Sequence, residues 1–310
     1  MTSKSWASLW LGLAVLVLAG GPAASEPIIV STTPAADGAA MFVADAEGFY
    51  AKHGVEVKPT LTTLMPTLPA ALMSNSVQIG CITTTTFVQA VAGGLDLVAI
   101  AGGSIVSHQL NNTALVARAD SGIKEPRDLI GKKIGVPGIG AYFHVVFSYW
   151  LLEKGVDPKQ VQFVEVPFPL MRDNLASKTV DGVGAVDPVL TLIVNSGVGY
   201  VAAQVIQDLP EGKSILVYAA TRDWANAHRK EVAAFQAAIA DADAVIAADP
   251  NKAVADFGKY VKMPAPALAA TKIGIQKADL SEDQISFWVD VMRKQGLLTG
   301  PVDTSKMIFR

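Results

Sequence analysis

Short apolar runs alternate along the first third of the chain with stretches whose apolar residues recur at helical spacing. The apolar runs predict four β-strands, at 28–32, 55–61, 77–82 and 95–101. The stretches between them predict helices at 39–54 and 64–75, and a third helix that follows the run of four threonines at 83–86 and ends at Gly93. This succession predicts a mostly parallel sheet with helices on both faces.

The alternation restarts near Thr113. Further strands or extended runs are predicted at 112–118, 134–136, 161–166, 182–186, 200–206 and 214–219, with helices at 141–154 and 170–177. The rest of the chain is almost wholly helical, at 229–248, 250–261 and 281–295, and the last of these opens with the capping-box pattern of Ser281 and Gln284. A length of 310 residues also allows two modest cores, so the chain is expected to form two lobes.

Residues 132–147, KKIGVPGIGAYFHVVF, predict a strand, a turn and a helix start in close succession. Gly140 would let a ligand approach the backbone, and free N–H groups at the helix start would face an acceptor-rich or anionic group. The alternative is that the glycines only form a tight turn. The ligand contacts predicted here are Gly140, Ala141, Tyr142 and His144.

Polar residues follow the predicted strands of the first part of the chain. Because the carboxyl ends of parallel strands gather at one edge of a sheet, these residues are expected to lie together there. The ligand contacts predicted at this edge are Thr33, Gly38, Thr84, Thr85 and Ser104. The alternative for any single threonine of the run is that its hydroxyl caps the following helix.

Asp187 follows the predicted strand at 182–186 and precedes Pro188. Two interpretations remain open for its carboxylate. It caps the next helix, or it also faces the ligand and accepts a hydrogen bond from a ligand N–H, hydroxyl or ammonium.

The composition of the chain argues against several classes of protein function. Charged residues are 17% of the chain, the net charge is −3 and no basic run occurs, which argues against nucleic acid as a partner. The single cysteine, Cys81, excludes an internal disulfide and is expected to be a small buried residue. The four histidines show no metal-ligand spacing, so neither a metal nor another cofactor is predicted.

The first 25 residues have the organisation of a cleaved signal peptide. Lys4 precedes an apolar segment at 9–18, and small residues follow up to Ser25, which places cleavage before Glu26. The alternative is an uncleaved membrane anchor, but the apolar segment is short for a bilayer span. No cysteine follows it to accept a lipid. The mature chain is therefore expected to be soluble in the periplasm.

The order of these segments resembles a known family. The phrases that carry the resemblance are FVADAEGFYAKHGVEVKP, GCITTTT, AVAGGLDLVAIAG, DSGIKEPRDLIGKKIGVPGIGAYFH and AVDPVL. They are similar to the periplasmic solute-binding components of ABC importers in the nitrate, sulfonate and taurine group. This SsuA/THI5-like (NMT1) family shares its fold with thiamine-pyrimidine synthesis proteins. The tryptophan that often precedes the proline of AVDPVL in this family is absent, since Val186 and Asp187 stand there.

The resemblance implies a type II periplasmic binding protein, in which two α/β lobes are joined by two crossing strands. Residues 26–112 with 217–310 would form lobe 1, and residues 113–216 would form lobe 2. It also implies a monomer that closes over a small polar organic molecule and delivers it to an ABC permease and its ATPase. The sulfonate, carboxylate, amino-sulfonate and pyrimidine-like classes of solute stay open.

The residues bear on three other functions. An enzyme like the pyrimidine-synthesis relatives would be expected to carry a cysteine-rich motif, which Cys81 alone does not provide, and no G-x-S-x-G or paired carboxylates occur. A dinucleotide-binding domain would need a third glycine where Phe143 stands. Presentation of the ligand to a sensor instead of a permease stays open.

Overall fold

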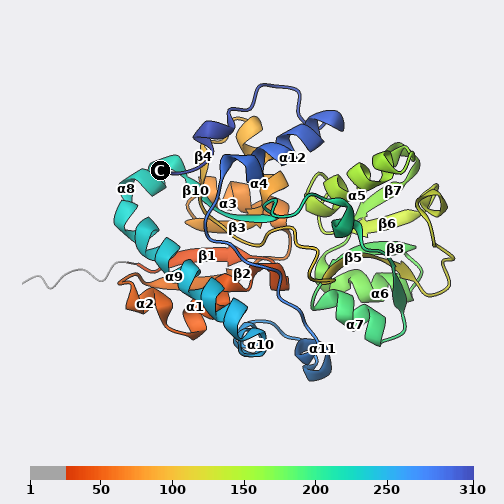
Figure 1. Ribbon diagram of the computed structural model, residues 1–310, viewed down its shortest axis with the longest axis horizontal. Helices are drawn as coiled ribbons and strands as arrows, with labels where there is room; N and C mark the ends of the chain where they lie inside the picture. The colour runs from red at the N-terminus through yellow and green to blue at the C-terminus, as the bar shows by residue number, and fades with distance from the viewer. Residues whose placement is uncertain (1–25) are drawn as a thin grey trace, which may run out of the picture.

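The alternating pattern forms two five-stranded sheets in the computed structural model, which describes residues 26–310. The first sheet has the order β2-β1-β3-β10-β4 and the second β7-β6-β8-β5-β9. The strands of the first are β1 (Ile28–Thr32), β2 (Val57–Leu61), β3 (Ile79–Thr83), β4 (Leu97–Gly102) and β10 (Leu216–Thr221). Those of the second are β5 (Thr113–Arg118), β6 (Lys133–Val136), β7 (Gln162–Glu165), β8 (Gly182–Val186) and β9 (Gly199–Ala203). Figure 1 shows the sheets in two lobes that lie side by side.

Each sheet contains one strand that runs against its neighbours. β10 pairs antiparallel with β3 and β4, and β5 pairs antiparallel with β8 and β9, while β1–β3 and β6–β8 are parallel pairs. β5 and β10 are the first strands formed after the chain passes from one sheet to the other. The predicted fold class, two mostly parallel sheets linked by two crossings, is confirmed.

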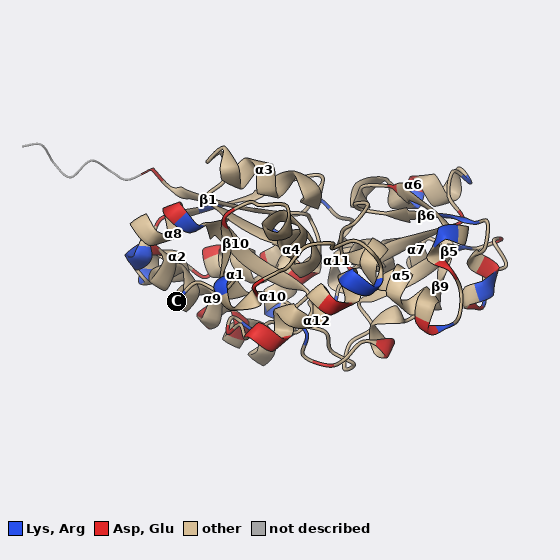
Figure 2. Cartoon of the chain, turned by 90° about the horizontal axis from the view of Figure 1, so that it is seen from above, with Lys and Arg blue, Asp and Glu red and all other residues tan. Residues whose placement is uncertain are grey.

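Helices cover both faces of the sheets. Around the first sheet these are α1 (Ala40–Ala46), α2 (Phe49–Lys52), α3 (Leu68–Met73), α4 (Thr84–Ala92), α8 (Arg222–Ala227), α9 (Arg229–Ala248), α10 (Pro250–Phe257), α11 (Ala265–Ala269) and α12 (Glu282–Lys294). Around the second they are α5 (Tyr142–Glu153), α6 (Met171–Ala176) and α7 (Val189–Asn195). Figure 2 shows acidic and basic residues interspersed over the outside of both lobes. Within residues 26–310, no helix has the length and apolar character that a membrane crossing needs.

Two predicted helices differ from the observed elements. The helix predicted at 39–54 is divided into α1 and α2, because Gly48 takes a left-handed φ of 70° that interrupts the helical hydrogen bonds. The helix predicted at 64–75 opens with a 3-10 turn at Met65–Thr67, in which the Leu68 N–H donates to the Met65 carbonyl. A continuous α-helix would need the N–H of residue 69 to bond to that carbonyl, and Pro69 has none.

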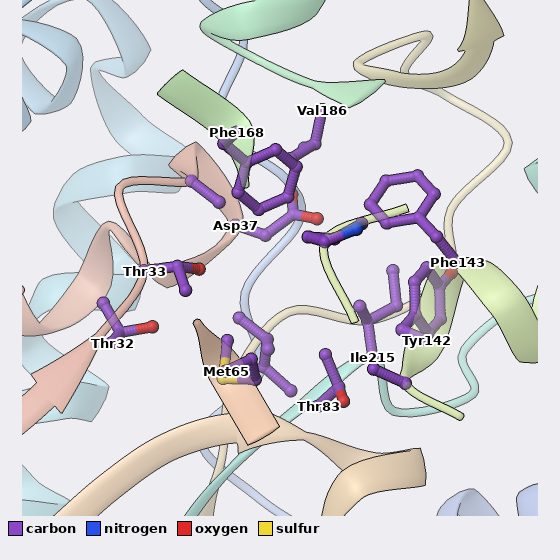
Figure 3. A pocket seen from close by; sticks show the side chains of 14 residues that line it. Thr32, Thr33, Asp37, Met65, Thr83, Tyr142, Phe143, Phe168, Val186 and Ile215 are labelled. Carbon is purple, nitrogen blue, oxygen red and sulfur yellow. The ribbon is translucent and has the colours of Figure 1, made fainter. Parts of the chain in front are cut away.

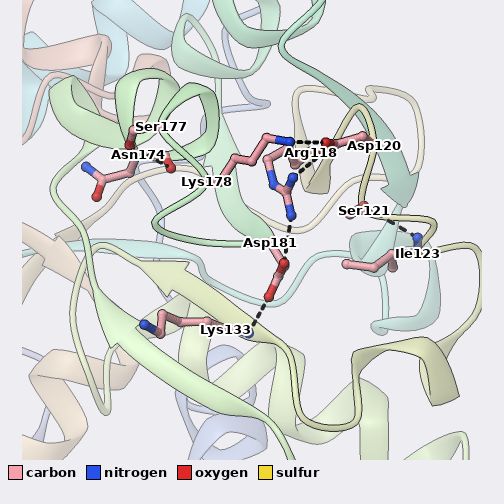
Figure 4. A network of polar contacts seen from close by, with 9 residues as sticks. All are labelled: Arg118, Asp120, Ser121, Ile123, Lys133, Asn174, Ser177, Lys178 and Asp181. Atoms are coloured by element: carbon pink, nitrogen blue, oxygen red, sulfur yellow. Dashed lines mark hydrogen bonds and ion pairs between the residues drawn. The ribbon is translucent and has the colours of Figure 1, made fainter.

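An ionic network fixes one end of the second sheet (Figure 4). Arg118, at the end of β5, donates to Asp181 over 2.9 Å and also pairs with Asp120, while Asp181 accepts the Lys133 N–H over 3.0 Å. The network therefore connects β5, β6 and the start of β8. Strand register places it at the end of the sheet opposite Val186, so it leaves the other end free for a site.

Candidate functional site

A small, partly open cavity lies between the lobes, at the carboxyl ends of β1, β3, β6 and β8. Its volume is about 40 Å³, room for about three water-sized groups. The first sheet and its loops contribute Thr32, Thr33, Ala35, Asp37, Met65 and Thr83; the second contributes Pro137, Ala141, Tyr142, Phe143, Phe168 and Val186; and the returning crossing contributes Ile215 and Leu216. Figure 3 shows these side chains converging from both lobes. The edge that the sequence predicted is therefore where the cavity lies.

Two hydroxyl groups of the cavity lack protein partners. Thr33 is 1% exposed and Tyr142 is 3% exposed, yet neither Thr33 Oγ1 nor the Tyr142 hydroxyl hydrogen-bonds to any other residue between 26 and 310. Tyr142 is held by edge contacts with Phe143 and with Trp288 of α12, whose ring centroids are 5.7 and 5.4 Å away. One hydroxyl from each lobe is thus available to a molecule in the cavity.

Asp37 is the one ionisable carboxylate of the cavity, and it was not among the predicted contacts. It lies in a 3-10 turn at Ala36–Gly38 that directly follows β1. Oδ1 accepts a hydrogen bond from Asn112 Nδ2 over 2.8 Å. Burial raises the pKa of Asp37 to about 6, with the nearby charge of Asp187 acting in the same direction and the Asn112 hydrogen bond opposing it. The position of Asp37 in the loop after a strand end could have marked it as a ligand contact. The residues of that loop, however, predict only a turn.

The start of α5 also faces the cavity. Ala141 and Tyr142 line it, and Ala141, the N-cap residue, supplies no side-chain hydrogen bond to the helix. The first-turn N–H groups therefore present partial positive charge toward the cavity. Gly140 precedes them with a left-handed φ of 78°, and its N–H donates to His144 Nδ1 over 2.9 Å. Gly140 and His144 therefore shape the turn but do not line the cavity.

Of the ten predicted contacts, Thr33, Ala141 and Tyr142 line the cavity, and the other seven do not. Thr84 donates to Ser214 Oγ over 3.0 Å, and the Thr85 hydroxyl lies 3.2 Å from that of Thr83. Gly38 packs against the Thr32 side chain, and Ser104 is fully buried beside the crossing. His144 instead lines a surface groove beside Phe163, where burial lowers its pKa.

Asp187 is occupied by protein donors. Its Oδ1 accepts the N–H and the hydroxyl of Thr191, over 3.1 and 2.7 Å, and its Oδ2 accepts the Lys272 N–H over 2.9 Å. Burial raises the pKa of Asp187 even so. The alternative interpretation, in which Asp187 caps the following helix, is the one these hydrogen bonds support.

In the run of four threonines at 83–86, one hydroxyl caps the following helix, as the alternative interpretation predicted. Thr83, at the end of β3, is the N-cap of α4, and its Oγ1 accepts the Thr86 N–H over 3.3 Å. Thr83 also lines the cavity, so the one threonine of the run that reaches it is the capping residue itself.

Residues 26–310 give no indication of a metal site or of a nucleophilic cysteine. No group of three or more His, Cys, Asp or Glu side chains among residues 26–310 has the arrangement of a metal site. Cys81 is buried in β3, and burial raises the pKa of its thiol to about 12. The thiolate needed for nucleophilic attack is therefore not populated near neutral pH.

Two α/β lobes with a cavity between them define the fold of the two-lobed periplasmic binding proteins. The chain belongs to the NMT1/THI5-like family, whose model matches residues 35–253. The resemblance predicted from the sequence is therefore confirmed.

Individual relatives agree with this assignment. A Haemophilus influenzae relative named "Putative thiamine biosynthesis protein" is 29% identical over 233 residues, 72% of this chain and 69% of its own length. The periplasmic aliphatic sulphonate binding protein SsuA from Escherichia coli has the same fold, with a TM-score of 0.75, 19% identity, and coverage of 92% of this chain and 98% of its own. The periplasmic nitrate-binding protein NrtA from Synechocystis PCC 6803 also has a TM-score of 0.75, with 18% identity and coverage of 90% and 83%.

Proposed function

We propose that this chain is the solute-binding component of an ABC importer and captures a small polar organic solute in the cavity between its lobes. The observation that carries the proposal is the pair of unpartnered hydroxyls, Thr33 from one lobe and Tyr142 from the other. A buried hydroxyl without a hydrogen bond costs about 1–3 kcal/mol. A ligand that bonds to both removes this cost only when the lobes are together.

The mechanism follows from that geometry. The solute enters when the lobes separate, and closure brings the start of α5 and the Thr33 loop onto it. The lobes then deliver it to a membrane permease whose ATPase drives transport. A sensor-coupled protein would bind the same solute without stimulating the ATPase of a reconstituted importer, so ATPase stimulation separates the two roles.

Binding without catalysis is part of this proposal. The cavity holds one carboxyl group, Asp37, while His144 lies in a separate groove and the Cys81 thiol is buried. No pair of acid and base therefore faces a bound molecule. Recovery of the bound solute chemically unchanged after long incubation is the expected result, and conversion of the solute would favour the enzyme.

Periplasmic location also belongs to the proposal, with the signal peptide at 1–25 lying outside the described residues. Export is expected to yield a soluble monomer that begins near Glu26. N-terminal sequencing of exported protein tests this, and retention of Met1 in the membrane fraction would refute it.

The experiment that tests the binding site is a thermal-shift screen of small solutes, followed by calorimetry on two variants. Thr33→Val and Tyr142→Phe each remove one cavity hydroxyl and keep the side-chain shape, so each is expected to weaken solute binding about 3- to 10-fold. Tyr218→Phe is the matched control, because the Tyr218 hydroxyl is also buried and unpartnered but does not line the cavity. Equal affinity in all three variants would refute the assigned site.

A further inference from the structure

The charged groups around the cavity are all of one sign. Among residues 26–310, no lysine, arginine or histidine lines it, and Asp37 supplies its single carboxyl group. The only other charge that acts on Asp37 is that of Asp187, which is also negative. Lys272 is the cation that acts on Asp187: burial raises the pKa of that carboxyl, and the charge of Lys272 lowers it.

Asp37 also has unused hydrogen-bonding capacity. It is 7% exposed, and the single hydrogen bond to its carboxylate from any residue between 26 and 310 is that of Asn112 to Oδ1. A carboxylate accepts about four hydrogen bonds. Figure 3 shows the carboxyl group directed into the space between Phe168 and the Tyr142–Phe143 side of the cavity.

The opposing wall of the cavity is aromatic. Phe143 contacts the rings of Tyr142 and Phe168 edge to face, with centroids 5.7 and 6.1 Å away, so these three side chains hold one another in place. Aromatic faces attract cations, and they do so more strongly where water is excluded. A carboxylate beside aromatic rings, with no cation among the lining residues, is complementary to a positively charged or N–H-rich group.

We infer that the solute brings a protonated or N–H-bearing nitrogen to Asp37, and that the site selects such small organic solutes over simple anions. This inference rests on the proposed function. The start of α5 supplies donors on the other lobe, so the same solute carries a hydrogen-bond acceptor at its second end. A small anion would find those donors but would meet the Asp37 charge in an enclosed space, where repulsion is poorly screened.

The test uses three molecules of nearly equal shape and different charge: acetamidinium, acetamide and acetate, with nitrate as a second anion. Affinities for the full mature chain are measured at pH 7.5 by ligand-observed NMR. The expected order is acetamidinium first, acetamide second, and acetate and nitrate last. Acetate or nitrate binding as tightly as acetamidinium would overturn the inference and leave the proposed binding function intact. A different result would instead overturn the proposed function: none of the four molecules binds, and neither Thr33→Val nor Tyr142→Phe affects the binding of any screened solute.

The variant Asp37→Asn tests whether the charge or the shape of this side chain determines binding. The variant keeps an oxygen that can accept the Asn112 hydrogen bond and removes the negative charge. Acetamidinium is expected to bind about 10- to 100-fold more weakly, the usual loss for a charge-assisted hydrogen bond, while acetamide changes less than about 3-fold. Asp241→Asn is the control, since Asp241 pairs with Lys52 at the surface, away from the cavity. An equal loss for acetamidinium and acetamide would show that Asp37 acts through shape alone and would overturn the inference.

The pH dependence gives a second readout. Acetamidinium keeps its charge throughout the range, so its affinity is expected to fall as pH drops through about 6 and Asp37 becomes protonated. Asp187, the Tyr142 hydroxyl and the Cys81 thiol are the other titratable groups that interact with Asp37. Tyr142 and Cys81 stay protonated in this range because burial raises the pKa of each. Asp37→Asn is expected to flatten the profile. A profile that stays equally steep in the variant would assign the titration to another group and contradict the role of Asp37.

Discussion

Buried polar residues in this protein fall into two groups that look alike in the sequence. Asp187 accepts three hydrogen bonds from protein groups, and the Thr84 hydroxyl donates to Ser214. Asp37, Thr33 and Tyr142 are equally buried but keep unused hydrogen-bonding capacity toward the cavity. At the scale of single residues, a ligand contact is distinguished by two features together, an unsatisfied polar atom and a position in the cavity lining, since the hydroxyls of Ser104 and Tyr218 are also unpartnered but do not line the cavity.

Asp37→Asn is predicted to stabilise the unliganded protein at pH 8. The carboxyl pKa is raised from 3.8 to about 6, so the ionised form costs the folded state about 3 kcal/mol above that pH. Urea unfolding should show the gain at pH 8 and its loss below pH 4, where the wild-type carboxyl is protonated in both states. Asp128→Asn is the control of opposite sign, because hydrogen bonds from the Lys124 and Glu125 N–H groups lower the pKa of Asp128. A destabilised Asp37→Asn at pH 8 would contradict the prediction.

The pH dependence of stability is predicted to reflect a second buried acid as well. Burial raises the pKa of Asp243 in α9 to about 7, although its Oδ2 accepts the Ala278 N–H over 2.7 Å. A raised carboxyl pKa means that the folded state holds the proton more tightly than the unfolded state. The stabilisation is therefore full below about pH 4 and is lost as pH rises through 6 to 7. Chemical unfolding of the wild type should show a free energy of unfolding that falls across this pH range. The dependence on pH should be flatter when both Asp37 and Asp243 are changed to Asn. An unaltered dependence in that double variant would be evidence against these two groups.

At the scale of elements, α5 connects the fold to the site. Its first turn reaches the cavity because β6 ends at Val136 and the turn over 137–141 reverses into the helix within a few residues. Gly140 makes this reversal possible, since its φ of 78° is unfavourable for any residue with a side chain. A Cβ at this position would also lie 3.0 Å from Gln89 Nε2 of α4, in the other lobe.

Gly140→Ala is predicted to lower stability by about 1–2 kcal/mol and to weaken solute binding, because it strains the turn that aims the first N–H groups of α5. Gly155→Ala at the other end of the same helix is the matched control. Gly155 has a similar φ of 73° and open space around its Cα, so its substitution should lower stability without affecting affinity. Calorimetry and thermal unfolding of both variants separate the two effects. Equal changes in affinity would mean that the turn has no special part in binding.

At the scale of the whole molecule, the lobes meet around the cavity through a few specific contacts. Gln295, directly after α12, donates through Nε2 to the Val145 carbonyl of α5 over 2.8 Å, and the Ala36 N–H donates to the Asp187 carbonyl over 2.8 Å. Tyr142 and Trp288 add an aromatic contact across the same boundary. In the proposed mechanism these contacts stabilise the closed arrangement and break when solute enters.

Gln295→Ala is predicted to weaken solute binding about 2- to 10-fold without touching the cavity, because it removes one hydrogen bond from the closed form only. Small-angle scattering should show a larger radius for the unliganded variant than for the wild type, and a common smaller radius when both are saturated with solute. Gln236→Ala is the control, since Gln236 Nε2 donates to the Ile100 carbonyl within one lobe. If the radius is the same with and without solute, the hinged mechanism does not hold.

The sequence by itself determined the arrangement of strands and helices and the edge at which a site forms. The period of apolar residues sets each element, and parallel strands bring their following loops together whatever the details of packing. For that reason Thr33 and Tyr142, which come directly after a strand end and at a helix start, could be predicted as cavity residues. The break at Gly48, which the expected helix passed over, and the restricted opening turn expected from Pro66 and Pro69 also follow from local backbone chemistry.

Only the tertiary structure decided which of two similar acids faces the cavity. Asp37 and Asp187 each follow a strand, and nothing local separates them. Asp187 is occupied because Lys272, 85 residues away in sequence, supplies an N–H to the oxygen that Thr191 leaves unpaired. Asp37 receives a single donor from Asn112, 75 residues away, and keeps the rest of its capacity for the cavity. Such long-range partners depend on how the two lobes meet, and the pattern of hydrophobic and polar residues along the chain does not encode that geometry.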